Sequence, residues 1–354
     1  MNDRLLRALR CEPADRTPVW FMRQAGRCLP RYREIRTRLG IPEILGDPER
    51  AAEVTALPLE YFPVDAVILF MDLSTPFPPA GLRVEFVAGV GPVVDSPIAD
   101  AAGARRLRAF EPREELAFVL ETIRLLTERL ELPVIGFVGA PFTLCSYLVP
   151  GGTRAHRLQA LKTLMWRDPE AWGYLAGFWS EQVAEFAVAQ FEAGAAVVQL
   201  FDSWAGELGP AEYERYVLPY NGRILSRIAE AGVPTIHFAT GNPRLLPLIA
   251  RAGGDAISVD WRTPIDEAWA AIGAGRAIQG NLDPVALLAG EETSVALTRE
   301  ILSRVDRRPG HIFNLGHGIL PETDHRVIRA VVDAVHGFGG AEAVDGTGTP
   351  DGGR

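Results

Sequence analysis

Lysine is nearly absent from this sequence: Lys162 is the only lysine among 36 basic residues, and the other 35 are arginines. A coding bias explains such a replacement of lysine by arginine throughout a chain. The scarcity still restricts the chemistry, because a Schiff base with a substrate or with pyridoxal phosphate requires a lysine amine. Lys162 lies in a predicted helix, residues 160–164, and not at a strand end. We therefore expect no lysine-based catalysis.

Cysteines, long apolar runs and excess positive charge are also lacking. Cys11, Cys28 and Cys145 are too few and too scattered for a disulfide framework, which favours a reducing, cytoplasmic location. No apolar run approaches about 20 residues, so we expect no membrane span. Residues 1–5 lack the features of a signal peptide. The net charge of −9 argues against nucleic-acid binding.

The 354 residues contain eight short apolar runs, separated by longer stretches with helical periodicity. The runs do not alternate with polar residues, which is typical of parallel strands buried on both faces. They cover residues 18–22, 66–70, 134–138, 197–201, 235–239, 256–260, 277–281 and 311–315. Eight strand–helix units predict an α/β fold, a single (β/α)8 TIM barrel. A doubly wound open sheet is the alternative, and no Gly-x-Gly-x-x-Gly turn supports it.

Other segments complete this predicted organisation. Helical periodicity is clearest over residues 114–130 and 168–193, the second opening with an N-cap Asp168 and Pro169. The glycines at 89–91, between apolar runs, predict a short β-hairpin insert. No linker interrupts residues 1–338, so we expect one domain there. Residues 339–354 are rich in Gly, Pro, Asp and Thr and predict a disordered tail.

Two arginines flank small residues in Arg23-Gln24-Ala25-Gly26-Arg27, directly after the first predicted strand. Each guanidinium can bind a carboxylate through two hydrogen bonds, and small residues between them let a ligand approach the backbone. On an acidic protein this segment indicates a site for a polycarboxylate or a phosphate. A solvated basic helix face is the alternative, and we favour it for the arginines of residues 31–38.

Active sites of TIM barrels lie at the carboxyl ends of the strands, where this sequence places Asp72, Tyr147, Ser203 and His317. Asp72 is the strongest candidate, because a carboxylate behind an apolar strand loses hydration unless donors or cations pair with it. Ser203 could instead cap a helix, and Tyr147 could pack against a loop. Helix capping is the preferred interpretation for Asp260 and Asp283, which also follow strands.

Metal and phosphate sites have little support in the sequence. The cysteines are far apart, there is no His-x-Cys pair, and no Gly-x-x-x-x-Gly-Lys loop occurs. We therefore expect no metal.

Five further motifs occur together with residues 23–27 and in a fixed order. They are Gly139-Ala140-Pro141-Phe142-Thr143-Leu144 with Tyr147, Gly151-Gly152, and residues 200–206, 279–284 and 314–319. In combination they resemble the uroporphyrinogen decarboxylase family over roughly residues 3–338. Two positions depart from the family pattern: Cys28 stands where an aromatic residue is common, and Met71 where a serine is common. These departures leave the local packing around Cys28 and Met71 undetermined, but they remove no group to which the family pattern gives a role in the reaction.

The resemblance implies a cytoplasmic homodimeric barrel enzyme, a carboxy-lyase that uses no cofactor and no metal. Such an enzyme removes the carboxyl groups of the four acetate side chains of uroporphyrinogen III, giving coproporphyrinogen III for haem and related tetrapyrroles. The protonated pyrrole would serve as the electron sink. Catalytic roles are implied for Asp72 and Arg23. The substrate-contacting residues implied by the motifs are Arg23, Gln24, Ala25, Gly26, Arg27, Asp72, Tyr147, Ser203 and His317.

Two other functions remain open on the sequence alone. A corrinoid- or zinc-dependent methyltransferase would share the barrel, but its His-x-Cys…Cys zinc site is not in this sequence. A non-catalytic tetrapyrrole carrier could use the same scaffold and would tolerate the loss of Asp72. A purified carrier would be expected to arrive coloured by bound porphyrin or haem.

Overall fold

Seven parallel strands form one curled sheet in the computed structural model, which describes residues 2–87, 90–151, 153–273 and 275–338. The strands follow one another in the sheet in chain order, apart from the two strands of an insert. They are β1 (Val67–Ile68), β4 (Val134–Gly139), β5 (Val197–Asp202), β6 (Thr235–Ala239), β7 (Ala256–Ser258), β8 (Ala277–Leu282) and β9 (His311–Leu315). Seven of the eight predicted strands are therefore confirmed.

The first predicted strand, residues 18–22, closes the barrel without forming a regular strand. Val19 makes a parallel bridge to Phe313 of β9, and the amide of Phe313 donates to the carbonyl of Pro18 at 2.9 Å. On the other side, the amide of Asp65 donates to the carbonyl of Val19 at 2.8 Å. Proline has no N–H for a ladder bond, which limits the pairing at the start of this segment.

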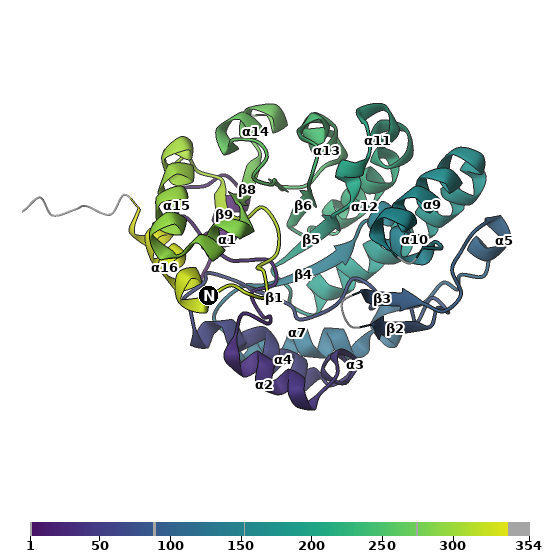
Figure 1. Ribbon diagram of the computed structural model, residues 1–354, viewed down its shortest axis with the longest axis horizontal. Coiled ribbons are helices and arrows are strands. Elements are labelled where there is room, and N and C mark those ends of the chain that lie inside the picture. Colours follow the sequence, from purple (N-terminus) through teal and green to yellow (C-terminus); the bar gives the residue numbers. More distant parts are fainter. Residues whose placement is uncertain (1, 88–89, 152, 274, 339–354) are drawn as a thin grey trace, which may run out of the picture.

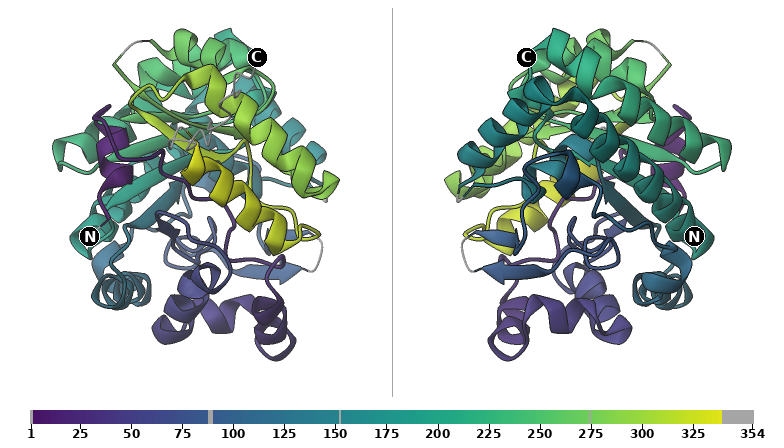
Figure 2. Two further views of the ribbon diagram at one scale, coloured as in Figure 1. Left: turned by 90° about the vertical axis from the view of Figure 1, so that its left-hand side faces the viewer. Right: turned by 90° about the vertical axis from the view of Figure 1, so that its right-hand side faces the viewer.

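Helices enclose the curled sheet from outside, as Figures 1 and 2 show. The first eight helices in chain order are α1 (Arg4–Leu9), α2 (Pro30–Arg38), α3 (Ile41–Leu45), α4 (Pro48–Ala56), α5 (Ala101–Ala104), α6 (Pro112–Glu115), α7 (Ala117–Arg129) and α8 (Pro141–Leu148). The others are α9 (Arg154–Arg167), α10 (Pro169–Glu192), α11 (Pro210–Tyr216), α12 (Leu218–Glu230), α13 (Leu246–Ala252), α14 (Ile265–Ile272), α15 (Glu291–Val305) and α16 (His325–Gly337). Short 3₁₀ turns are η1 (Leu57–Glu60), η2 (Ala205–Glu207), η3 (Pro243–Leu245) and η4 (Pro284–Ala289).

The two clearest helix predictions are confirmed with one adjustment. Helix α10 begins at Pro169, and the carboxylate of Asp168 accepts a hydrogen bond from the amide of Ala171 at 2.9 Å as its N-cap. The stretch 114–130 is divided between α6 and α7, because Leu116 leaves helical geometry between them.

The predicted insert is also present, as β2 (Val84–Val87) paired antiparallel with β3 (Gly91–Val94). The predicted disorder of residues 339–354 lies outside the described residues. No helix in the described part of the chain is long and apolar enough to cross a membrane.

The barrel interior beneath the strand ends contains bonded polar side chains as well as apolar ones. The indole of Trp20 donates to the side-chain oxygen of Gln279 at 2.9 Å. The amide nitrogen of Gln279 in turn donates to Gln199 at 3.0 Å and to Ser258 at 2.9 Å. Because these four side chains are fully buried, they close the floor of the barrel and link strands that are not neighbours.

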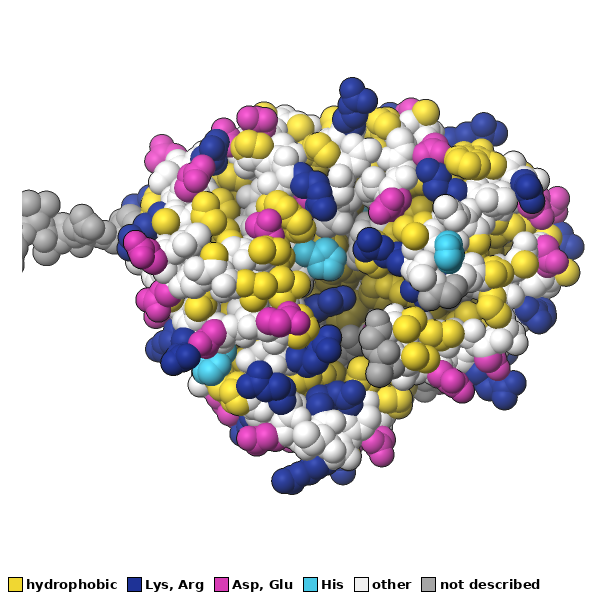
Figure 3. All heavy atoms as spheres, viewed as in Figure 1, with side chains coloured by type: hydrophobic (Ala, Val, Ile, Leu, Met, Phe, Trp, Pro, Cys, Tyr) yellow, Lys and Arg dark blue, Asp and Glu magenta, His cyan; other side chains and the backbone are white. Residues whose placement is uncertain are grey.

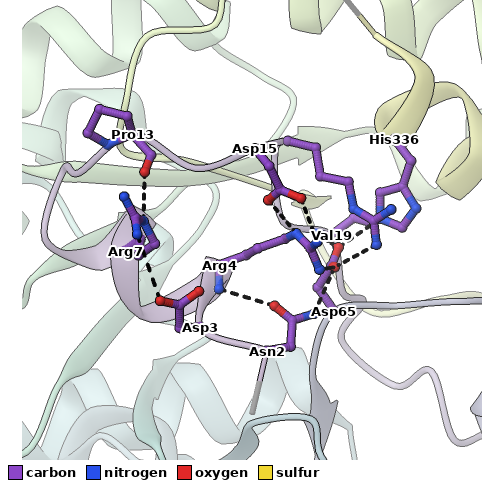
Figure 4. Close-up of polar contacts among 10 residues, drawn as sticks. Asn2, Asp3, Arg4, Arg7, Pro13, Asp15, Val19, Asp65 and His336 are labelled. Carbon is purple, nitrogen blue, oxygen red and sulfur yellow. Dashed lines mark hydrogen bonds and ion pairs between the residues drawn. The ribbon is translucent and has the colours of Figure 1, made fainter. Parts of the chain in front are cut away.

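A polar cluster around Asp65 ties the start of the chain to its last helix at the amino end of β1 (Figure 4). Asp65 accepts hydrogen bonds from the amide of Val19 at 3.0 Å and from the side chain of Asn2 at 3.1 Å. His336 of α16 lies 2.7 Å from the same carboxylate. Arg4 and Arg16 complete the cluster at 3.4 and 3.2 Å, on the side of the barrel where residues serve stability.

Candidate active site

A cavity opens at the carboxyl ends of the strands, visible as the hollow in the middle of Figure 3. It encloses about 880 Å³ of space, part of it open solvent, and basic side chains gather around it (Figure 3). Six of the nine residues predicted to contact a substrate line this cavity: Arg23, Ala25, Asp72, Tyr147, Ser203 and His317. The barrel therefore brings together side chains that are up to almost 300 positions apart in the chain.

Aromatic side chains form one wall of the cavity. Phe137 of β4 packs against Phe201 of β5 with ring centres 5.4 Å apart, and Phe201 packs against Phe238 of β6 at 5.3 Å. Phe238 lies 6.0 Å from the ring of His317. All four line the cavity, so they offer a large flat ligand an apolar surface of edges and faces. The three phenylalanines were not predicted as site residues.

Asp72 lies on the cavity wall, half-buried, in the turn that follows β1. Its Oδ1 accepts hydrogen bonds from the amide of Ser74 at 2.8 Å and from the Ser74 hydroxyl at 2.5 Å. These two bonds form a local turn that orients the carboxylate. Within the described residues Asp72 has no ion-pair partner, so a ligand bound here faces an uncompensated negative charge.

Arg23 has an unusual backbone conformation, with a φ of 62°. A non-glycine residue in this left-handed region is uncommon and is often found at functional sites. Its side chain lies against Gly318, where a Cβ atom would come within 2.5 Å of Cδ and 2.8 Å of Cγ of Arg23. The glycine after His317 therefore leaves the space in which the Arg23 side chain runs.

We expect a Gly318→Ala substitution to displace Arg23 and to lower kcat/KM by about tenfold, the cost of misplacing one charged contact. The double variant Arg23→Ala/Gly318→Ala is the control, because without the arginine side chain the new methyl group has nothing to displace. Gly318→Ala should then add no further loss to Arg23→Ala. Equal losses in both backgrounds would show that Gly318 does not act through Arg23.

His317 and Tyr147 both present hydrogen-bond donors to the cavity. Burial lowers the pKa of His317 to about 4, and the nearby Arg23 also lowers it. The amide of Gly318 donates to Nδ1 of His317 at 2.8 Å, so the proton of the neutral ring is on Nε2. Burial, followed by the charge of Asp72, raises the pKa of Tyr147. At neutral pH both groups are therefore uncharged donors.

The pKa of His317 gives a prediction for the pH profile of activity. Because its pKa is lowered to about 4, the imidazole stays neutral from pH 8 down to about 5, and a His317→Gln variant should keep the wild-type pH profile there. The ring resonance assigned by comparison with that variant should titrate near pH 4 in NMR. A titration near the usual pKa of about 6.5 would contradict this assignment.

Three predicted contact residues are placed away from the cavity wall. Gln24 is completely buried; its side chain donates to the carbonyl of Ala66 at 3.1 Å and accepts from the amide of Phe21 at 3.0 Å. Its side chain therefore links the first barrel segment to the next strand and does not line the cavity. A Cβ at Gly26 would lie 2.9 Å from the carbonyl of Arg23, so Gly26 permits a tight turn. Arg27 is exposed and does not line the cavity.

Further arginines lie near the cavity that sequence reasoning missed. The charges of Arg262 and Arg154 both contribute to lowering the pKa of His317. Arg262 pairs with Asp260 at 2.5 Å and lies over the ring of Trp261 at 4.5 Å. No motif identified these arginines, because an arginine in a loop or at the start of a helix is recognised as part of a site only when its neighbours in space are known.

The structure also bears on the predictions for helix capping and for Lys162. Asp283 caps η4 by accepting from the amide of Val285 at 2.9 Å, as predicted. Asp260 does not cap a helix; it accepts from the amide of Gly241 at 2.7 Å and pairs with Arg262. Lys162 lies in α9 and pairs with Glu212 at 3.2 Å, away from the cavity wall. Among the described residues, no group of three or more His, Cys, Asp or Glu side chains could hold a metal ion.

Comparison with known proteins identifies the family. The sequence model of the family Uroporphyrinogen decarboxylase (URO-D) matches residues 1–338. This chain belongs to the uroporphyrinogen decarboxylase family. It is 50% identical over 338 residues to a uroporphyrinogen decarboxylase of Sorangium cellulosum, covering 95% of this chain and 96% of the relative. It is 47% identical to one of Thermus thermophilus, covering 95% and 98%.

Similarity to solved structures extends beyond this family but shows the fold alone. A methyltransferase from Methanosarcina mazei superposes with a TM-score of 0.76 at 23% identity, covering 95% of this chain and 98% of that one. A B12-independent methionine synthase from Shewanella reaches a TM-score of 0.53 at 14% identity, covering 84% and 87%. The relatives at 45–50% identity are uroporphyrinogen decarboxylases, so the methyltransferase alternative is not favoured, and the chain is an enzyme of the carboxy-lyase type.

Proposed function

We propose that this protein decarboxylates the four acetate side chains of uroporphyrinogen III to give coproporphyrinogen III, with no cofactor or metal. The observation that carries the proposal is the carboxylate of Asp72 on the wall of an aromatic-lined cavity, which has no ion-pair partner in the described part of the chain. A macrocycle with inward-pointing N–H groups needs a central acceptor of this kind. Its many peripheral carboxylates need the basic side chains that surround the hollow in Figure 3.

The chemistry requires a place for the electron pair released when CO2 departs. Protonation of the pyrrole carbon next to the acetate-bearing carbon makes a cationic ring. The C–C bond to the carboxylate then breaks, its electron pair flows into the ring, and an exocyclic methylene forms. A second proton converts the methylene to methyl, and loss of the first proton restores the pyrrole. For each acetate, one proton is consumed in total and one CO2 is released.

Asp72 stabilises the cationic ring in this scheme. Its carboxylate accepts hydrogen bonds from the pyrrole N–H groups, which become more acidic as the ring is protonated, so the interaction strengthens in the transition state. The bonds from Ser74 to Oδ1 hold the carboxylate in position beforehand. The apolar wall of Phe137, Phe201 and Phe238 reduces water around the charge and strengthens the attraction.

The other cavity residues bind the periphery of the substrate. Arg23 pairs with the carboxylate of the reacting acetate and is the residue best placed in the scheme to relay the proton. Tyr147 and the Nε2–H of His317 are neutral donors for further carboxylates, and Ser203 adds a hydroxyl on the same wall. Neutral donors are suited to this task because they bind a carboxylate without holding the product as strongly as a cation would.

The family and the composition also support an inference about the cellular setting. We infer that residues 1–338 work as one domain, in the cytoplasm and as a homodimer, with no nucleic-acid or membrane partner. Three free cysteines are consistent with a reducing compartment. Size-exclusion chromatography with light scattering tests the dimer directly.

The decisive experiment is an anaerobic incubation of the purified protein with freshly reduced uroporphyrinogen III, followed by oxidation and chromatography. Stepwise appearance of products with seven, six, five and four carboxyl groups, without added metal or cofactor, would establish the activity. Unchanged substrate from well-folded protein would reject it. Protein that arrives coloured and retains porphyrin without turnover would indicate a carrier.

A further inference from the structure

Two arginines at the start of α9 stack on two aromatic side chains beside the cavity. The guanidinium carbon of Arg154 lies 4.8 Å from the centre of the Trp204 ring, and that of Arg157 lies 5.4 Å from the centre of the Tyr147 ring. A side-chain hydrogen bond from Trp204 is one of the interactions that lower the pKa of Tyr147, against the larger effect of burial. We call these four residues the arginine–aromatic cluster.

Arg157 is buried, although no acidic side chain in the described part of the chain pairs with it. Its side chain is 8% exposed, and no other arginine in the described residues is buried to this degree. None of the described acidic residues forms an ion pair with it. The guanidinium nitrogens of Arg157 are not among the fully buried, unpartnered side-chain atoms of the described residues, so the group keeps some contact with water and can meet an anion. Losing most of its hydration without a counter-ion still has a cost, and a stack on a tyrosine ring offsets only part of that cost. Arg262 differs, because Asp260 already neutralises it.

The charges of the cluster act on groups that line the cavity. The positive charge of Arg157 is among the causes that oppose the burial-driven rise in the pKa of Tyr147. The charge of Arg154 contributes to lowering the pKa of His317. Both affected groups are on the cavity wall. The positive potential of the cluster therefore reaches the cavity from the side of β4 and β5. The charge of Arg23 comes from a different place, the end of the first barrel segment.

We propose that Arg157, with Arg154 beside it, forms a carboxylate-binding subsite next to Tyr147, the member of the arginine–aromatic cluster that lines the cavity. The inference rests on the proposed function, because a tetrapyrrole with eight carboxylates needs anchoring points on more than one side of the ring. Arg157 neutralises a peripheral carboxylate that Tyr147 contacts through its hydroxyl. Arg154, which is exposed, adds attraction at the rim. In this arrangement Arg23 and Arg157 hold different carboxylates of one substrate.

A purely structural role makes the opposite prediction for stability. If Arg157 only packed on Tyr147, its replacement by methionine would remove a favourable contact and lower Tm. If Arg157 instead binds an anion of the substrate, its charge is uncompensated in the free protein, and Arg157→Met should leave Tm unchanged or raise it. Binding of a polycarboxylate should then weaken although the protein is no less stable.

The experiment compares Arg157→Met with Arg223→Met. Arg223 also stacks on a tyrosine, with its guanidinium 5.9 Å from the Tyr220 ring, but it is exposed on α12. Its partner Tyr220 does not line the cavity, whereas Tyr147 does. The readouts are the Kd for uroporphyrin I by fluorescence quenching, KM and kcat for uroporphyrinogen III, and Tm. We expect Arg157→Met to raise Kd and KM by roughly tenfold to a hundredfold, as for a charge-assisted hydrogen bond. The salt dependence of KM should also become weaker, and Arg157→Lys should recover part of the binding.

The outcomes separate the subsite from the proposed function. Unchanged Kd and KM in Arg157→Met, with wild-type turnover, would overturn the subsite and leave the decarboxylase intact. If the wild type shows no turnover, the decarboxylase is rejected. Weaker uroporphyrin binding by Arg157→Met would still support the subsite in that case. If Arg157→Met fails to fold, the exposed Arg154→Met carries the test, and an unchanged Kd in that variant would overturn the proposal.

Discussion

Replacing Asp72 with asparagine is expected to lower kcat by about 10²- to 10³-fold, the usual loss for one preorganised electrostatic group. Asparagine keeps the Oδ1 acceptor that binds the amide and hydroxyl of Ser74, so the turn should keep its shape. The negative charge is lost, and an N–H₂ group would face the pyrrole N–H donors. The cationic ring would then lack its stabilising partner. Chromatography of timed anaerobic reactions measures the rate.

Asp283→Asn is the matched control for this experiment. Asp283 also follows a barrel strand, but it caps η4 and does not line the cavity. We expect its kcat to stay within about twofold of wild type, since a capping asparagine retains the acceptor. Both variants should unfold at the wild-type temperature. Near-normal turnover by Asp72→Asn would eliminate the central carboxylate from the mechanism.

The largest effect on stability is expected from Asp65→Ala. This carboxylate is 1% exposed and accepts from Asn2, Val19 and His336, with Arg4 and Arg16 close by. Its removal leaves the Val19 amide and the side chains of Asn2, His336 and Arg16 without this acceptor, while Arg4 keeps its pair with Asp15. Breaking a buried pair costs about 3–5 kcal/mol. Urea denaturation followed by circular dichroism measures the change in the free energy of unfolding.

Asp15→Ala supplies the control, because Asp15 pairs with the same Arg4 at 2.6 Å while its own side chain is 61% exposed. An exposed pair contributes at most about 1 kcal/mol. If both variants lost the same amount, burial at Asp65 would not be the cause.

The Asp65 cluster also predicts how stability depends on pH. Although burial alone raises the pKa of Asp65, the hydrogen bond and charge of His336, with the Val19 amide and Asn2, lower it overall. A lowered pKa in the folded state stabilises the protein above the unfolded value of about 3.9. The contribution is lost as the pH falls through the folded pKa. The stability difference between wild type and Asp65→Ala should thus be constant near neutrality and shrink below about pH 4.

Much of the fold followed from local patterns. Apolar runs without alternation predicted seven strands that are present, and Asp168 with Pro169 predicted the start of α10. The segment at residues 18–22 was the exception. Its pairing depends on Phe313 and Asp65, which are far away in the chain, and the missing N–H of Pro18 reduces the ladder.

The site was predicted in part because barrel geometry assigns strand ends to one face. That rule located Arg23, Asp72, Tyr147, Ser203 and His317, which line the cavity. The rule does not give the direction of each side chain: Gln24 lies between Arg23 and Ala25 in the chain, and its side chain is buried in the core. It also gave no indication of Arg157, which comes from a helix and reaches the site only through its contact with Tyr147.

The amino-acid sequence by itself determined which segments become strands and helices and which polar groups stand at strand ends, because these depend on residues close in the chain. Only the tertiary structure decided which side chains face the cavity. Phe137, Phe201 and Phe238 lie in strands that are buried on both faces, with Phe201 itself half-buried, so an apolar side chain at these positions would fit either face. The register between neighbouring strands and the curl of the sheet select the direction of each side chain, and both arise from contacts between distant segments.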